Sequence, residues 1–366
     1  MTAKHIALAG ISVVVAAFMA CRKDEVQPVA TPGGSGANNV VIDLDSIPYP
    51  KLSQYGFFTG NLAALQPAAG VVPYTVINGA FGDYTEKLRF VWMPAGSKAS
   101  YVADNRALDF PEGTVLAKTP YYPRTLPGMR QRNMDTRLLI RKNGDWVFAE
   151  YIWNEEQTEA FLDLSGRNVP VTWVDDAGQP HDEVFRVPSE GECMACHKQY
   201  DERIAISPKP QNLNTLFNYP EGPMNQLAKW ASIGYLDGNY PTHIETVARW
   251  DDPAETLERR VRGYLDINCS HCHNEGGFCG YRPIRFAWDE SADPAHLGIC
   301  VPPQIPLDPG VDYIVNAGNA DRSMLYYRLG STDESVRMPL LERTVRHEEA
   351  IQLVAEWINS MPPSCP

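Results

Sequence analysis

The chain lacks several features that would point to other classes of protein. It has no excess of basic residues, since 32 Lys and Arg stand against 45 Asp and Glu and the formal net charge is −13. Nucleic acid is therefore not expected as a partner, because phosphate binding needs a basic face. No hydrophobic run of membrane length follows residue 20, and residues 42–188 hold no GxSxG, HExxH or phosphate-loop motif. Hydrophobic residues make up 44% of the chain and charged residues 21%, which predicts a folded globular protein.

The N-terminus has the pattern of a lipoprotein signal. Residues 6–20 form a short apolar run that follows Lys4 and ends at Ala20-Cys21. Such a run is too short to span a bilayer, and a small residue before Cys resembles the bacterial lipobox. We predict a signal peptide over residues 1–20 and a lipid anchor on Cys21, which would place an exported protein on the periplasmic or surface side of the outer membrane. An ordinary signal peptide with an incidental Cys is the alternative. Residues 21–45 are rich in Gly, Ser, Pro and Asn, which predicts a flexible tether.

Residues 46–188 show the pattern of a β domain. The β-prone runs 136–142 and 146–153 flank Asn143-Gly144-Asp145, and the runs 171–174 and 183–187 flank a second turn at Asp176-Ala177-Gly178. Both pairs predict hairpins, because Gly accepts a positive φ without steric cost. We expect a mainly-β, sandwich-like domain, followed by a mainly-α cytochrome c-type region with two haems.

Two CxxCH motifs carry the chemistry, at Cys193–His197 and at Cys269–His273. In one helical turn such a motif presents two thiols to the vinyl groups of a porphyrin and an imidazole to its iron. We therefore predict two covalently bound haem c groups, attached through Cys193 and Cys196 and through Cys269 and Cys272, with His197 and His273 as iron ligands. A zinc site or disulfides are the alternatives, but neither explains a His directly after both Cys pairs.

The second motif lies in a stretch, residues 251–366, that is typical of a cytochrome c domain. Asp252-Pro253 predicts a helix start, and Gly263 is expected to allow close approach of another helix. Leu257, Val261, Tyr264 and Leu265 form one apolar face, and Ile351, Val354, Trp357 and Ile358 form another on a helix over 348–360.

Met338 is the predicted sixth iron ligand of the second haem, because a Met-Pro on a loop before the last helix is the usual source of that ligand. His347 is expected to be a surface or cap residue at the start of that helix.

The first haem segment, residues 189–250, leaves its sixth ligand open. Met224, His243 or no protein ligand are all compatible with the sequence. Of the remaining cysteines, Cys279 and Cys300 flank an insertion, which favours a disulfide between them and leaves Cys365 over.

The chain from Tyr55 onward resembles a family of bacterial dihaem c-type cytochromes. The stretches that carry the resemblance include YGFFTG, FGDYTEKLRFVWMPAG, ECMACH, RGYLDINCSHCHNEGG and MPLLERTVRHEEA. The resemblance implies the same haem-attachment cysteines and proximal histidines, and it matches Met338 as well. It also implies a partner, since members often accompany a parallel β-helix repeat protein, in addition to redox partner proteins.

These patterns leave three hypotheses for the function. The first is a membrane-tethered electron-transfer protein or the haem subunit of an oxidoreductase. The second is a dihaem peroxidase with an open first haem. The third is a binding module whose β domain recognises a partner while the haems sense redox state.

Overall fold

The structure is a computed structural model that describes residues 40–307 and 310–366. The predicted signal peptide, Cys21 and most of the predicted tether lie outside the described residues. Among the described residues, no helix has the length and apolar character needed to cross a membrane.

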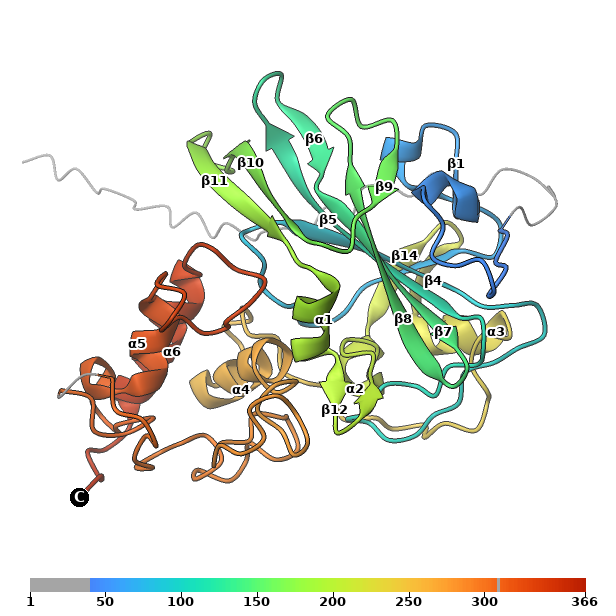
Figure 1. Cartoon of the computed structure of the whole chain (residues 1–366). Helices are drawn as coiled ribbons and strands as arrows, with labels where there is room; N and C mark the ends of the chain where they lie inside the picture. The colour runs from blue at the N-terminus through green and yellow to red at the C-terminus, as the bar shows by residue number, and fades with distance from the viewer. Residues whose placement is uncertain (1–39, 308–309) are drawn as a thin grey trace, which may run out of the picture.

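A large antiparallel sheet dominates the N-terminal half of the molecule (Figure 1). Nine strands of the described chain belong to it, and the long strand β5 pairs with four of them. β4 pairs with one edge of β5. β7 and β6 pair with successive parts of its other edge, and the β10–β11 hairpin pairs with the C-terminal end of β5. The strands are β3 (Val72–Tyr74), β4 (Glu86–Trp92), β5 (Val115–Thr125), β6 (Arg130–Asn133), β7 (Asp135–Lys142), β8 (Asp145–Trp153), β9 (Ala160–Leu162), β10 (Arg167–Val174) and β11 (Pro180–Val187).

The predicted β character and both predicted hairpins are confirmed. Asn143 and Gly144 turn β7 into β8 with φ values of 55° and 73°, and Gly178 turns β10 into β11 with φ 80°. The expected sandwich is wrong in one respect: the nine strands are hydrogen-bonded into one sheet rather than two. The reason is that β5 is long enough to pair with different strands along its two ends.

Mostly irregular segments, each with one small two-stranded sheet, cover both faces of this sheet. On one face, side chains such as Trp92, Leu138 and Tyr151 pack under residues 40–71. That covering segment contains η1 (Leu52–Tyr55), β1 (Phe58–Thr59), η2 (Leu62–Ala64) and β2 (Gln66–Pro67). On the opposite face, alternate side chains such as Val91 and Leu116 pack under residues 205–244. That part contains α2 (Pro210–Leu213), β14 (Leu216–Tyr219), β15 (Gly222–Asn225) and α3 (Gln226–Ser232).

A second core forms around three helices near the C-terminus, drawn in orange and red in Figure 1. They are α4 (Leu257–Asn268), α5 (Met324–Gly330) and α6 (Glu348–Ser360), with η3 (Ala320–Arg322) before α5. The predicted apolar faces of α4 and α6 meet in this core. α4 starts later than expected, because Thr256 rather than Asp252 caps it by accepting from the Arg259 amide at 3.3 Å. A mainly-α region is not seen, since the described residues between α4 and α5 form turns and loops apart from the short η3.

The disulfide of this region differs from the expected one. Cys300 is bonded to Cys365, with their Cα atoms 5.0 Å apart, and Cys279 is free. The chain after α6 folds back so that Cys365 lies beside Val315, whose carbonyl also accepts from the Cys300 amide at 2.9 Å. The Cys279 amide instead donates to the Cys272 carbonyl at 2.9 Å, next to the second motif.

Gly263 does allow a close approach, but not by another helix. It lies against the backbone of Ala248, and a Cβ atom at Gly263 would lie 2.2 Å from the Ala248 carbonyl oxygen. The buried Asn78 amide donates to that same carbonyl at 2.7 Å and thereby ties the segment after β3 to α4.

We predict that Gly263→Ala lowers the free energy of unfolding by about 1–3 kcal/mol, because the carbonyl it would strike is held by Asn78. Urea unfolding followed by circular dichroism measures the change. Gly330→Ala is the matched control, since a Cβ at this helical glycine meets nothing within 4 Å. Equal stability of the Gly263→Ala protein and the wild type would contradict the prediction.

Candidate functional site

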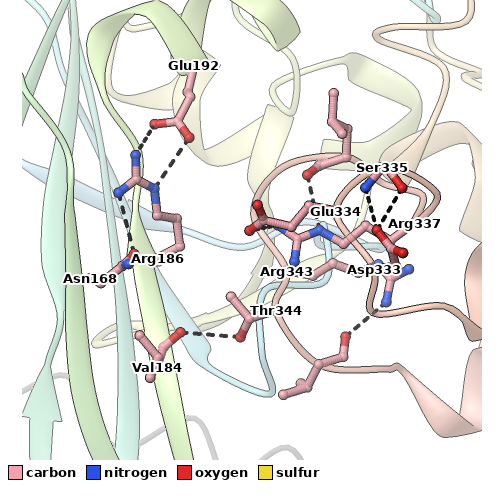
Figure 2. Close-up of polar contacts among 12 residues, drawn as sticks. Asn168, Val184, Arg186, Glu192, Asp333, Glu334, Ser335, Arg337, Arg343 and Thr344 are labelled. Atoms are coloured by element: carbon pink, nitrogen blue, oxygen red, sulfur yellow. Dashed lines mark hydrogen bonds and ion pairs between the residues drawn. The ribbon is translucent and has the colours of Figure 1, made fainter.

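The first motif lies on α1 (Glu190–Cys196), which follows β11 directly. Ser189 and Glu192 form a capping box: the Glu192 amide donates to Ser189 Oγ at 3.3 Å, and the Ser189 amide donates to Glu192 Oε2 at 2.7 Å. Figure 2 shows Arg186 between Glu192 and Asn168, with 2.8 Å from Arg186 Nη2 to Glu192 Oε2. These contacts fix the start of the helical turn that carries Cys193 and Cys196.

His197 ends α1 in an orientation suited to metal ligation. Its Nδ1 lies 2.8 Å from the Ile204 carbonyl oxygen. A carbonyl can only accept, so Nδ1 carries the proton and Nε2 keeps a free lone pair. Burial lowers the pKa of His197 to about 4, which keeps the imidazole neutral near pH 7. Metal-binding histidines commonly have a backbone carbonyl in this position.

The second motif continues the end of α4. The His273 amide donates to the Cys269 carbonyl at 3.0 Å, which extends the helical turn through the motif. The ring of His273 packs edge-on against Phe286 at 5.4 Å, and burial lowers the pKa of His273 to about 4. Both proximal histidines predicted from the motifs are therefore partly buried imidazoles that are neutral near pH 7.

The fold brings the two motifs into contact, although they are far apart in sequence. The ligand atoms of Cys196, His271 and Cys272 all lie within 4.8 Å of one another. Cys272 Sγ also lies 3.5 Å from the carbonyl oxygen of Ala195, inside the first motif. Within the described residues, the four motif thiols form no disulfide, so each remains available for a bond to another group.

A cavity of about 360 Å³ opens beside the second motif, within the size range of ligand sites. Cys269, Cys272, His273 and Met338 all line it, so the predicted pair of iron ligands shares one cavity. Met324 on α5 lines it too. Several large apolar side chains of its lining are exposed, at 60% for Phe278, 69% for Tyr281, 56% for Ile305 and 40% for Leu340. An apolar ligand in the cavity would cover such surface.

The loop that carries Met338 is held by polar contacts at both ends. The Met338 amide donates to the Arg328 carbonyl at 3.0 Å, and the buried Arg343 guanidinium donates to the same carbonyl at 3.0 Å. Figure 2 shows Arg337 beside Glu334 and Thr344 beside the Val184 carbonyl of β11.

A smaller cavity of about 100 Å³ lies beside the first motif, between α1 and the sheet. Cys193, Cys196 and His197 line it, and holding a macrocycle there requires the surrounding side chains to move apart. Neither Met224 nor His243 is among its described lining residues. Met224 lies on β15 with 40% of its surface exposed, and His243 is exposed as well. Both belong to the segment that covers the sheet near α2 and α3, so the fold does not bring either one to the first motif.

The two cavities adjoin each other. Five residues line both of them: Ala80, Cys196, His271, Leu341 and Glu342. His271 occupies a variable position of the second motif and Glu342 follows Met338 in the loop. Sequence reasoning assigned neither a role, because only the meeting of the two motifs places them here.

Comparison with known proteins adds no identification. No family model matches the chain, and neither a curated protein nor a solved structure matches it. The function is therefore inferred from the fold and from the geometry of the two motifs.

The structure also corrects the interpretation of His347. It does stand at the N-cap of α6, but only 11% of its side chain is exposed, and its ring is stacked on Phe81 at 4.1 Å and lies edge-on to Trp250 at 4.9 Å. Phe81 lines the second cavity, so His347 packs against a residue of the cavity wall. Burial lowers the pKa of His347 from 6.5 to about 4, although nearby Glu349 acts in the opposite direction.

This shift predicts a pH-dependent stability. The unfolded chain binds a proton at His347 more tightly than the folded chain does. The free energy of unfolding is therefore highest above pH 6.5 and decreases as the pH falls from 6.5 toward 4. The loss amounts to roughly 3 kcal/mol. We expect His347→Gln to flatten this part of the pH profile in urea unfolding, whereas His243→Gln, at an exposed site, keeps the wild-type profile. Parallel profiles for the wild type and His347→Gln would refute the assignment.

Proposed function

We propose that this protein is a dihaem c-type cytochrome that transfers electrons while tethered to a membrane by a lipid on Cys21. The observation that carries the proposal is that each CxxCH motif places its imidazole in a cavity of its own and that the two cavities adjoin. When bound, haem supplies one-electron chemistry at its iron.

The residues of the chain have separate parts in this proposal. The thiols of Cys193, Cys196, Cys269 and Cys272 would form the thioethers that hold the two macrocycles. His197, oriented by the Ile204 carbonyl, and His273, packed on Phe286, would be ligands of the two irons. Met338 would be a second protein ligand of the second iron, and a thioether ligand favours the reduced state. The apolar walls of the second cavity would exclude water from the bound group.

The adjoining cavities support electron transfer between the two centres. A group attached through Cys196 and one attached through Cys272 would be close at their edges, because these two sulfur atoms belong to one cluster of ligand atoms within 4.8 Å. Exchange with redox partner proteins, among them a parallel β-helix repeat protein, belongs to the same proposal. The partial exposure of Phe278 and Tyr281 supports contact at the mouth of the second cavity.

A peroxidase is the second candidate function. It is favoured by one observation: among the described residues that line the first cavity there is no Met, and the imidazoles are His197 and His271. His271 lies among the motif sulfur atoms, so we do not assign it as an iron ligand. A first iron with His197 as its single protein ligand would be open to a small substrate.

The number of covalent haems tests the proposal. We expect mass spectrometry of the mature protein to show two haem additions that survive acid–acetone extraction, since thioethers are not broken by acid. The double variant Cys193→Ser/Cys196→Ser and the double variant Cys269→Ser/Cys272→Ser should each lose one. Cys279→Ser is the matched control, because this free cysteine lines the second cavity outside both motifs and should keep both haems. Recovery of zinc bound at Cys196, His271 and Cys272 in place of haem would sink the proposal.

The sixth ligand of the second haem gives a further test. We expect Met338→His to keep both haems attached and to lower one haem potential, because imidazole in place of a thioether favours Fe(III) and ligand identity moves haem potentials over about 0.8 V. The weak far-red sulfur-to-iron band of the oxidised protein should disappear. Met224→His, at an exposed site outside both cavities, should change neither the band nor the potentials. If the band persists in Met338→His and is lost in Met324→Leu, Met324 is the ligand instead.

A further inference from the structure

Three cationic side chains lie in one row across the face of the sheet that borders the first cavity. Arg89 on β4 is directly opposite Lys118 on β5, and Lys118 is directly opposite Arg137 on β7. The row ends at Glu150 on β8, opposite Arg137. All four residues line the cavity. Like charges at directly opposite positions destabilise a sheet, and buried charges need partners, so this row requires anions.

The described anions are gathered at one end of the row. Arg137 is paired with Asp135 at 3.0 Å and with Glu150 at 3.2 Å. Glu342 is paired with Arg137 and also with Lys118, at 3.3 Å from the Lys118 Nζ. These three carboxylates therefore compensate the Arg137 end.

Arg89, at the other end, has no such partner in the described part of the chain. Only 7% of its surface is exposed, its Nε has no hydrogen-bond partner, and no described carboxylate lies within ion-pair distance of it. Its neighbour across the sheet on the outer side is Tyr74, which carries no charge when protonated. Lys87, two residues earlier on the same strand and therefore on the same face, is a partly buried amine whose Nζ donates to the Thr85 carbonyl at 2.6 Å, and desolvation together with nearby Arg89 and Lys118 lowers its pKa to about 7. The Arg89 guanidinium thus lies at the wall of a cavity without a directly paired carboxylate among the described residues, although the more distant Glu342 attracts it.

We propose that Arg89 binds a carboxylate pair inside the first cavity, and that this pair is the two propionates of the first haem. The inference rests on the proposed function. Haem carries its propionates on the edge away from the vinyl groups that bond to cysteine. The cysteines of α1 and the cationic row line the same cavity, so a macrocycle held by Cys193 and Cys196 has its counter-charges within the same walls. A guanidinium is suited to this role, because its fork binds carboxylates in a bidentate manner.

Arg89 is then a positioning residue with an electrostatic effect on the first centre. A fixed positive charge near the iron favours the reduced state, and it also keeps the propionates ionised. A free dicarboxylate or inorganic phosphate offers the same chemistry as the propionates, so the experiment has to separate the two sources.

Spectroelectrochemistry of the full-length holoprotein, with the haem number checked by mass spectrometry, tests the proposal. We expect Arg89→Gln to keep two haems and to shift downward the potential of the haem that lacks the far-red sulfur band, while the Met338 haem changes little. Arg124→Gln is the matched control: this arginine lies on the neighbouring strand β5 but pairs with the exposed Asp176, so neither potential should move. Two attached haems and an unmoved first potential in Arg89→Gln would overturn the inference while leaving the proposed function intact.

A second variant provides the test if Arg89→Gln does not accumulate. Arg89→Lys retains the charge but not the fork, so we expect the propionate bending mode in its resonance Raman spectrum to shift while the first potential stays near the wild-type value. An unchanged propionate mode contradicts the inference. In a separate arm, the wild-type holoprotein is titrated with inorganic phosphate and with succinate. No change in melting temperature is expected, whereas a rise that Arg89→Gln abolishes would assign the site to a free anion instead of the propionates.

Discussion

The partly buried contact of Glu342 with Lys118 and Arg137 is the interaction on which the arrangement of the two cavities depends. Glu342 lies in the loop that follows Met338, and its two cationic partners lie on β5 and β7. Burial alone would raise the pKa of Glu342, but Lys118 and Arg137 hold it well below its usual range. Removing Glu342 would leave the two cations without this anion, which destabilises the fold because all three groups are at least partly withdrawn from water. The contact therefore holds the loop between α5 and α6 against strands β5 and β7 of the large sheet.

Neighbouring contacts extend this joint between the sheet and the helical core. The Asp83 carboxylate accepts from the Thr344 amide at 2.7 Å and from the Val345 amide at 3.2 Å, just before α6 begins. On the other side of α4, the Asn78 amide bridges the carbonyls of Ala248 and Gly263. The partners of both side chains are backbone groups of segments far away in sequence. The segment before α6 is thereby held near β11, and the segment before α4 is held against the loop that follows β3.

Predictions that depended on local spacing agree with the structure. The Asn143-Gly144 hairpin, the apolar faces of α4 and α6, and the shared cavity of His273 and Met338 could all be anticipated from residues close in sequence or from a short pattern. The failures have a common origin. The Cys300–Cys365 bond, the backbone of Ala248 beside Gly263 and the burial of His347 each depend on segments that meet only after the chain has folded.

The sequence by itself determined the chemistry that each short segment can offer. A CxxCH motif spans one helical turn, so its thiols and imidazole are related by local geometry, and period-two or helical spacing decides which side chains share a face. Only the tertiary structure decided which residues of distant segments lie beside these short segments. The register of β4, β5 and β7 aligns Arg89, Lys118 and Arg137 in one row, and the packing of α1 near α4 joins Cys196 to Cys272. Strand register and helix packing follow from the burial of the whole core and its charges, which no short window of residues contains.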